Sequence, residues 1–336
     1  NTENIYLCLD LMKTNALKGM RDILPEEQKI RDYVQQKIIK TYKDAGFERI
    51  STPILEDSEN LDKSDGGDNL NLIFKVLKRG EKLESALQSS SVDEKSLSDM
   101  GLRYDLTLPL SRFFAANKNQ LPYPFKVIQT DRVYRAERPQ KGRLREFIQC
   151  DIDILGESSC NAEVELIDVT ARAMLEIGFK DFSININDRR ILRNMLENIG
   201  FPSDTLDSVC ITFDKLDKIG AEGIEKELKE KLFPSNAISA LVDFVKKGNI
   251  SLDEVVSQCA DKSIADDLKY IISTVEKISQ GKYQIKYCPN LVRGQGYYTG
   301  VVFEIACPQF NAAVGGGGRY DNMIGKFLGQ NVPAVG

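Results

Sequence analysis

The chain has no histidine among its 336 residues. This absence excludes every mechanism in which the chain itself supplies an imidazole, such as a Ser-His-Asp triad, a Cys-His nucleophile pair or a histidine-rich metal site. Any catalysis must therefore use carboxylates, arginines, lysines, tyrosines or a bound metal ion.

Long apolar runs and patterned cysteines are also lacking. No run approaches the roughly 20 apolar residues of a membrane-spanning helix, and residues 1–20 lack the basic start and cleavage site of a secretory signal. The seven cysteines are odd in number and widely separated, which indicates neither a disulfide framework nor a C-x-x-C zinc site. We therefore expect a cytoplasmic protein without a membrane partner, and we predict no metal ion held directly by protein ligands.

Acidic residues outnumber basic ones, but positive charge is concentrated in one place. The net charge of −5 argues against a surface that binds nucleic acid indiscriminately. Residues 132–145, RVYRAERPQKGRLR, nevertheless contain five arginines and Lys141, and they join two strand-like stretches of which the second ends in Asp151 and Asp153. Guanidinium groups pair bidentately with phosphate oxygens, so this turn of a β-hairpin could clamp a polyphosphate. A solvated hairpin balanced by Glu137 and Glu146 explains the same charges equally well.

Apolar spacing and breaker residues predict the order of the elements. Residues 26–46 read as a helix between Pro25 and Gly46, and residues 47–56 as a strand that Pro53 restricts to a sheet edge. Residues 70–84 predict two strands that turn at Arg79-Gly80, and residues 85–99 predict a solvated serine-rich loop. Residues 102–117 predict a strand followed by a helix, with Asp105 and Thr107 at the end of the strand. Strands on both sides of the basic turn, a helix at 162–178 and a strand at 182–188 complete this part of the chain.

A block of short helices interrupts the strand pattern between residues 188 and 282, and strands resume at 283–287 and 296–308. Strand-rich segments on both sides of a helical block indicate an insertion into one domain. The glycines of VGGGGRYD, residues 314–321, predict a turn at which the backbone can approach a ligand closely. This run is neither a Walker loop nor a dinucleotide fingerprint.

Several segments together resemble one family. They are KGMRDILPEE (18–27), GFERISTPILE (46–56), LRYDLTLPLSRFFA (102–115), VYRAERPQKGRLREFIQCDIDILG (133–156), INDRRIL (186–192), DKLDKIG (214–220), LVRGQGYYTGVVFE (291–304) and GGGGRYD (315–321). The chain resembles class II aminoacyl-tRNA synthetases, specifically the histidyl-tRNA synthetase family, from about residue 16 to residue 336. Residues 46–56 match motif 1, residues 133–156 match motif 2, and the last two segments match the histidine-specific motifs.

The resemblance implies an α+β fold in which an antiparallel sheet is flanked by helices. The catalytic domain would comprise residues 1–187 and 283–336, with a helical insertion domain at 188–282 and a homodimer built on motif 1. The implied substrates are histidine, ATP with Mg²⁺, and the acceptor end of tRNA(His). Histidine and ATP would give histidyl-adenylate, from which the histidyl group passes to the tRNA.

The resemblance also implies roles for individual residues. The implied ATP contacts are Arg135 at the α-phosphate, Glu137 near the adenine and Arg143 at the γ-phosphate. The implied histidine contacts are Asp105 and Thr107 at the α-amino group, Gln149 beside it, Arg135 at the carboxylate, and Asp153 and Tyr298 at the imidazole, with Tyr297 and Arg293 in the same site. Arg135 and Arg293 would act catalytically from opposite sides of the α-phosphate.

Two departures from the family pattern matter. The first histidine motif has Gly296 where relatives more often carry an acid, and the sequence reaches VPAVG where motif 3 would begin. We accordingly expect the anticodon-binding domain to be absent, and activity of this stretch alone is left open. The alternative is a non-catalytic relative, the regulatory subunit of ATP phosphoribosyltransferase. Loss of the ATP-binding arginines would favour it, but Arg135, Arg143 and Arg293 are all present.

Overall fold

The centre of the protein is a long antiparallel hairpin. The computed structural model describes residues 12–64, 67–89, 91–139, 142–248, 250–293, 296–310 and 313–336. Strands β5 (Phe125–Tyr134) and β6 (Glu146–Leu155) pair along their full length, as their alternating apolar residues and the basic turn predicted. Every later feature of the site is placed relative to this hairpin.

The hairpin belongs to an extended mixed sheet. Strand β1 (Glu48–Arg49) pairs parallel to β5, and β11 (Ala334–Val335) pairs antiparallel to β6. A second group of strands has the order β10 (Gly315–Gly318), β9 (Val301–Ala306), β7 (Ser183–Asp188) and β8 (Gln284–Tyr287), in which only the β7–β8 pair is parallel. Gly318 and Gly336 exchange backbone hydrogen bonds of 2.9 and 3.2 Å, and Tyr320 N donates to Ala334 O. These bonds connect the edges of the two four-stranded sheets.

Helices cover both faces of the hairpin. Helices α1 (Pro25–Asp44) and α6 (Asn161–Glu176) contact each other on one face, with α12 (Asp266–Ser279) beside α6. Helices α2 (Ser58–Asp62), α5 (Thr107–Asn117) and α13 (Gly325–Leu328) contribute to a second apolar cluster that receives Phe125 and Leu155. Ile128 and Ile152 point to the opposite face of the hairpin, into another apolar cluster that includes residues of α6 and β7. They do so because alternate residues of a strand face opposite ways. The α+β arrangement of sheet and flanking helices is therefore confirmed.

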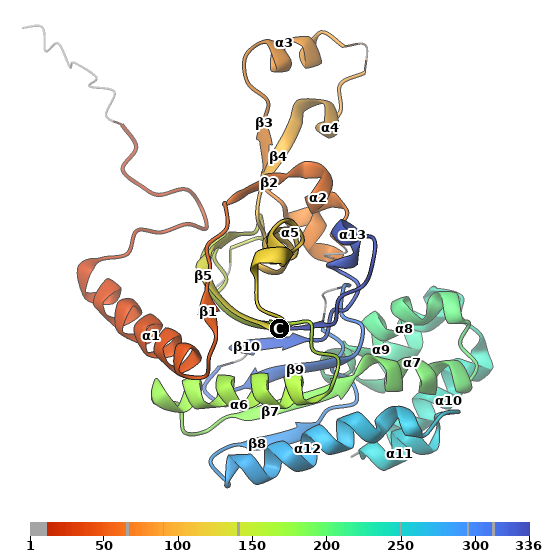
Figure 1. Ribbon diagram of the computed structural model, residues 1–336. Helices are drawn as coiled ribbons and strands as arrows, with labels where there is room; N and C mark the ends of the chain where they lie inside the picture. The colour runs from red at the N-terminus through yellow and green to blue at the C-terminus, as the bar shows by residue number, and fades with distance from the viewer. Residues whose placement is uncertain are drawn as a thin grey trace, which may run out of the picture.

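A small projection tops the molecule (Figure 1). It consists of strands β2 (Leu55–Asp57), β3 (Lys75–Leu77) and β4 (Ser98–Leu102), of helices α3 (Glu81–Leu87) and α4 (Glu94–Leu97), and of a 3₁₀ turn at Gly67–Leu72. The prediction of a second strand after Gly80 is wrong, since α3 begins there. The prediction of a loop at 85–99 is also wrong. Asp93 and Ser96 form a capping box that starts α4, and β4 follows with Ser98 buried.

Three further predictions need correction. The strand expected at 47–56 is split into β1 and β2 around Pro53, although β1 does lie at the sheet edge. Asp105 and Thr107 do not end a strand: β4 stops at Leu102, and Thr107 begins α5. The predicted glycine turn is strand β10. A Cβ on Gly317 would collide with the backbone of Gly336, so glycine is required there for close strand approach rather than for a turn.

The helical block predicted after residue 188 is present. It contains α7 (Arg189–Asn198), α8 (Leu206–Phe213), α9 (Leu216–Glu230), α10 (Ser235–Lys246) and α11 (Leu252–Ser257), with 3₁₀ turns at Ser203–Thr205 and Ser263–Ala265; a further 3₁₀ turn, Lys118–Gln120, follows α5. The buried apolar residues of these helices belong to the same cluster as those of β7 and β9. The domain borders near 188 and 282 stay predictions. Within the described ranges, no helix is long and apolar enough to cross a membrane.

Candidate active site

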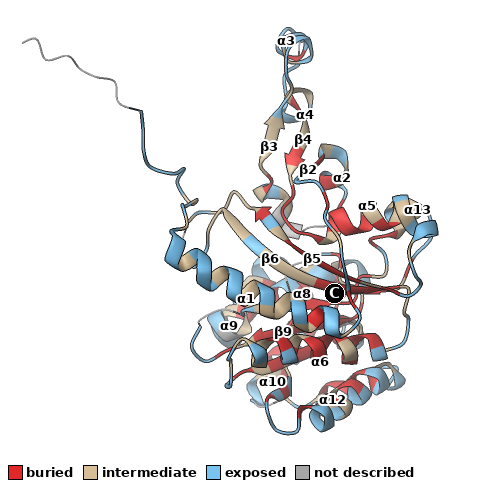
Figure 2. Ribbon diagram, turned by 60° about the vertical axis from the view of Figure 1, so that its left-hand side comes forward, coloured by how far each residue is buried: buried red, intermediate tan, exposed pale blue. Residues whose placement is uncertain are grey.

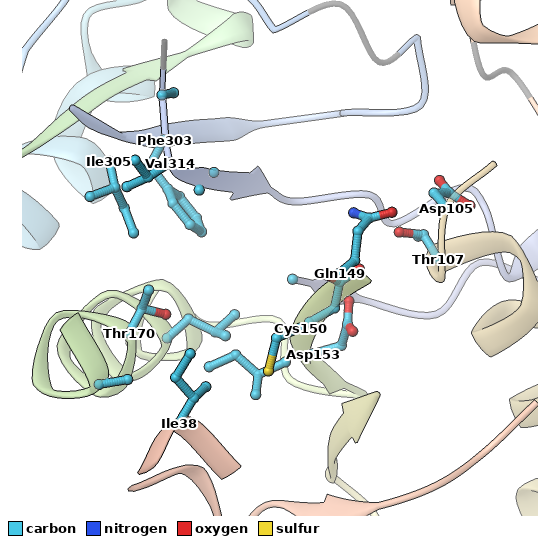
Figure 3. A pocket seen from close by; sticks show the side chains of 18 of the residues that line it. Ile38, Asp105, Thr107, Gln149, Cys150, Asp153, Thr170, Phe303, Ile305 and Val314 are labelled. Carbon is cyan, nitrogen blue, oxygen red and sulfur yellow. The ribbon is translucent and has the colours of Figure 1, made fainter. Parts of the chain in front are cut away.

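A cavity of about 500 Å³ lies where β6 faces β9 and β10. It has a polar part beside α5 and an apolar part between α1, α6 and β9 (Figure 3). All eight residues predicted to contact histidine line it: Asp105, Thr107, Arg135, Gln149, Asp153, Arg293, Tyr297 and Tyr298. These residues come from four separate segments of the sequence, which the fold brings to one place.

Side chains on one face of β6 form the floor of the polar part. Gln149, Asp151 and Asp153 alternate along the strand and all line the cavity. The amide end of Gln149 points toward Asp105 and Thr107 (Figure 3). Its Oε1 atom is buried and accepts no hydrogen bond from the described parts of the chain. A buried acceptor without a donor favours a ligand that brings one.

Asp105 is held at the entrance to α5. Its Oδ1 atom accepts a hydrogen bond from Leu108 N at 3.3 Å, and its Oδ2 atom accepts one from the hydroxyl of Tyr297 at 3.2 Å. On the far side of the cavity, the hydroxyl of Tyr320 donates to Asp153 Oδ1 at 2.6 Å. Both carboxylates are thereby fixed in position and almost fully buried.

Burial dominates the electrostatics of the three carboxylates. It raises the pKa of Asp105, and it raises the pKa of Asp153 to about 7 against the opposing hydrogen bond from Tyr320. The pKa of Asp151 is raised well above its ordinary value by burial and then by its neighbours Asp153 and Asp105. A ligand that carries positive charge or N–H donors would relieve this accumulation of negative charge.

Two arginines supply positive charge to the same cavity. Arg135 directly follows β5; its Nε donates to Tyr104 O at 3.0 Å, and its guanidinium lies 5.2 Å from the ring centre of Phe147. Arg293 has a left-handed backbone with φ of 61°, and its Nη1 lies 3.7 Å from Glu304 Oε2. Cations and carboxylates around one cavity suit a zwitterion together with an anionic group.

Aromatic side chains complete the wall. The rings of Tyr297 and Tyr298 meet edge to face with centroids 4.9 Å apart, and Tyr320 contacts Tyr297 in the same way at 6.1 Å. Burial raises the pKa of Tyr298 to about 12, and it also raises the pKa of Tyr297 well above its ordinary value. Both hydroxyls therefore stay protonated and can donate hydrogen bonds near neutral pH.

Two predicted ATP contacts lie outside the lining of the cavity. Arg143 and Glu137 pair with each other at 3.3 Å on the basic turn, and the Arg143 side chain is 64% exposed. Arg132 and Glu146 form a second surface pair at 3.2 Å. The described part of the basic turn therefore has paired charges at the surface, as expected of a solvated hairpin. Arg135, at the base of the turn, faces the cavity instead. Lys141 lies outside the described residues.

The predicted set misses Asp151 and Tyr320. Asp151 lies between Gln149 and Asp153 at the two-residue spacing of a strand face, and this alternation could have identified it. Tyr320 follows the glycine run, and only the pairing of residues 318–320 with 334–336 brings its hydroxyl to Asp153. Within the described ranges, no group of three or more acidic or cysteine side chains is arranged to hold a metal ion.

Comparisons with known proteins identify the family of the chain. A family model described as histidyl-tRNA synthetase matches residues 19–336. A histidine–tRNA ligase from Leifsonia xyli subsp. xyli is 44% identical over 95% of this chain and 76% of its own length. A histidine–tRNA ligase from Christiangramia forsetii is 36% identical over 96% of this chain and 74% of its own length.

Solved structures give the same result for the fold. The histidyl-tRNA synthetase from Nostoc sp. PCC 7120 matches with a TM-score of 0.78 and 25% identity, over 97% of this chain and 73% of that one. An ATP phosphoribosyltransferase regulatory subunit/histidyl-tRNA synthetase from Bacillus halodurans C matches with a TM-score of 0.79 over 97% and 80%, but at 23% identity it supports the fold alone. With nearly its whole length matched by the family model and by relatives above 30% identity, the chain belongs to the histidyl-tRNA synthetase family.

Proposed function

We propose that the chain activates histidine with ATP and Mg²⁺ to form histidyl-adenylate and transfers the histidyl group to the acceptor end of tRNA(His). The observation that carries this proposal is the gathering of eight residues from four segments around one cavity, whose lining combines buried acceptors with two arginines. The family relationship supports the same assignment.

Histidine would be held at three points. Its α-ammonium group would bind Asp105, Thr107 and Gln149, which would give the buried Gln149 Oε1 its missing donor. Its imidazole would lie between Asp153 and Tyr298, and its carboxylate would face Arg135. A pocket that hydrogen-bonds both ring nitrogens rejects amino acids that lack them, by factors on the order of 10⁴ when buried polar groups lose their partners.

The first reaction needs no general base. A carboxylate oxygen of histidine, already ionised, forms a bond to the α-phosphorus of ATP, while the bond from that phosphorus to the bridging oxygen breaks and pyrophosphate leaves. Arg135 and Arg293 would neutralise the charge that builds on the α-phosphate from opposite sides. Alignment of two anions and charge neutralisation then account for the catalysis, which suits a chain with arginines and no histidine.

In the second reaction, a hydroxyl of the terminal adenosine of tRNA(His) attacks the carbonyl carbon of the adenylate, and AMP leaves. On the ATP side, the Arg143–Glu137 pair of the basic turn would separate, with Arg143 moving to the γ-phosphate and Glu137 to the adenine. Mg²⁺ would enter with the ATP phosphates as part of the substrate. A role in aminoacylation also implies a cytoplasmic location.

Motif 1 would form a homodimer interface. Helix α1 exposes Ile30 and Tyr33, and Ile54 and Leu55 are partly exposed near the edge strand β1. Exposed apolar side chains of this kind are typical of a site that a second copy covers.

The regulatory-subunit alternative is not favoured. The relatives that are 44% and 36% identical are named histidine–tRNA ligases, whereas the structure whose name includes the regulatory subunit is 23% identical. Both Arg135 and Arg293, which catalysis needs, line the cavity.

The test is histidine-dependent exchange of pyrophosphate into ATP by the full-length gene product with Mg²⁺. We expect exchange with histidine and none with other amino acids. Arg135→Ala should lower it by at least about 100-fold, because a charge that stabilises the transition state is lost. Arg132→Gln, which removes a surface partner of Glu146 on the same turn, should leave it unchanged. Absence of exchange, together with co-purification of a phosphoribosyltransferase, would instead establish the regulatory role.

A further inference from the structure

Arg293 is held by a neighbour that is not part of the cavity wall. Glu304 lies in β9, where the strand register places it between Gly316 of β10 and Asn185 of β7. Its Oε2 atom lies 3.7 Å from Arg293 Nη1, and its Oε1 atom accepts a hydrogen bond from Asn185 Nδ2 at 3.4 Å. Asn185, Glu304 and Arg293 therefore form a row of polar contacts across the strands, and the row ends at the guanidinium of Arg293.

The backbone opposite Glu304 leaves room for this guanidinium. A Cβ on Gly316 would lie 2.5 Å from Arg293 Nη1 and 2.7 Å from its Cζ, so the guanidinium rests directly on the main chain of β10. The backbone of Arg293 itself is left-handed, which is uncommon for a residue with a side chain and occurs where the surroundings fix it. Three independent features thus converge on one orientation of one side chain.

The orientation brings Arg293 to the proposed substrate. Arg293 lines the cavity, while Glu304 does not. Burial raises the pKa of Tyr298, and the charge of Arg293 opposes this rise, which is expected when the guanidinium lies close to the phenol. Arg293 therefore contacts the site on one side and its carboxylate partner on the other.

We propose that Glu304 is a positioning residue for Arg293: it holds the guanidinium over Gly316 so that its remaining N–H groups face the reacting α-phosphate. This inference rests on the proposed function. Both side chains of the pair are about a quarter exposed, at 25% and 26%, so the ion pair adds little to the stability of the fold. Its loss should be evident in the reaction rather than in unfolding.

The experiment compares Glu304→Gln with the wild type in the full-length gene product. The substitution keeps the shape and removes the charge. We expect kcat for pyrophosphate exchange to fall between about 10- and 100-fold, the size of effect that misplacement of a catalytic group produces, with KM for histidine changed less than about threefold. The unfolding temperature should stay that of the wild type. Glu146→Gln, which breaks a surface ion pair with Arg132, is the matched control and should leave kcat unchanged.

A double-mutant cycle separates positioning from a structural role. In the Arg293→Ala background, Glu304→Gln should cause no further loss, because Glu304 acts through the side chain already removed. A loss equal to that in the wild-type background would overturn the proposal, and so would an unchanged kcat in the single variant.

A second readout does not depend on activity. Modification of Arg293 by phenylglyoxal, followed by mass spectrometry, should be faster in Glu304→Gln than in the wild type, because the guanidinium is released from its carboxylate. An unchanged rate would overturn the positioning role. If the wild type shows no pyrophosphate exchange but Arg293 still reacts faster in Glu304→Gln than in the wild type, the proposed function fails and the positioning role stands.

Discussion

Asp153 shows how a single residue connects the cavity to stability. Its pKa of about 7, against an ordinary value of 3.8, means that the folded protein holds this proton more tightly than the unfolded chain does. The associated stability is present below a pH of about 4 and is lost as the pH rises through about 7. An imidazole N–H needs an ionised Asp153 as its acceptor, whereas the unliganded fold is more stable when Asp153 is protonated. Ligand binding and stability therefore have opposite requirements at this residue.

We predict that Asp153→Asn stabilises the unliganded protein at pH 8 by about 1–3 kcal/mol, because an amide in this buried position does not ionise. The amide oxygen can still accept the hydrogen bond from Tyr320. Urea unfolding at several pH values should show the advantage over the wild type shrinking as the pH falls toward 4. A variant less stable than the wild type at pH 8 would contradict the assignment of this pKa.

We predict that Gln149→Ala raises KM for histidine by about 10- to 100-fold, because one hydrogen bond to a charged ammonium group is lost in a buried site. KM for ATP should change little, since Gln149 lies among the residues that face the amino group. Initial-rate kinetics of pyrophosphate exchange measure both constants. The control is Glu146→Gln on the same strand, and equal increases in both KM values would count against the role.

At this scale, the family resemblance identified the eight predicted histidine contacts, all of which line the cavity, and also Glu137 and Arg143, which lie outside the lining. Asp105, Gln149 and Asp153 lie in distinctive motifs, and the structure brings them together. Glu304 and Tyr320 act through neighbours on other strands, with register partners that are far away in the sequence. Periodicity within one strand cannot reveal which residue stands opposite on the next strand, so these two could not be found before the register was known.

At the scale of elements, β10 is the least predictable part of the sheet. Four successive glycines have low strand propensity, and a turn was therefore expected. The strand forms because it lies between β9 and residues 334–336, where a Cβ on Gly317 or Gly318 would meet the neighbouring backbone. Tertiary contact outweighs local preference here. By contrast, α1 and α6 follow their apolar spacing, and their extents agree with the sequence to within two residues.

The junction between β10 and α6 contains a buried ion pair. Arg319 binds Glu163, in the first turn of α6, through two bonds of 2.6 and 2.7 Å, and it also donates to the carbonyl oxygens of Glu157 and Ser159. Both side chains of the pair are less than a tenth exposed.

We predict that Arg319→Met lowers the free energy of unfolding by about 3–5 kcal/mol, because Glu163 is left as a buried charge without its partner. The double variant Arg319→Met/Glu163→Met should recover a large part of the loss. Chemical denaturation of both variants measures this. A double variant no more stable than the single one would show that the contacts of Arg319 with the two carbonyl oxygens and with Asp321, rather than its pair with Glu163, carry the energy.

At the scale of the whole molecule, the outer face of α1 remains uncovered. Ile30 is 65% exposed and Tyr33 57%, although the same helix packs its inner side against α6 (Figure 2). The helix itself follows from the sequence, but its uncovered apolar positions become apparent only when its neighbours are placed.

We predict that Ile30→Glu weakens the proposed homodimer by about tenfold or more, because a charge would be buried in an apolar interface. Sedimentation velocity over a range of concentrations measures the dissociation constant. Leu232→Glu, at a position 90% exposed on the helical block, is the control and should not change it. A dimer that tolerates Ile30→Glu would place the interface elsewhere.

The pairing of β6 with β11 has a consequence for how the protein folds. Strands β5 and β6 are neighbours in the chain, so this hairpin can form early with only a short loop to close. Pairing of Leu155 with Ala334 must bridge the whole helical block, and such distant contacts form slowly. We therefore expect the β6 wall of the cavity, with Gln149, Asp151 and Asp153, to form before β11 joins β6.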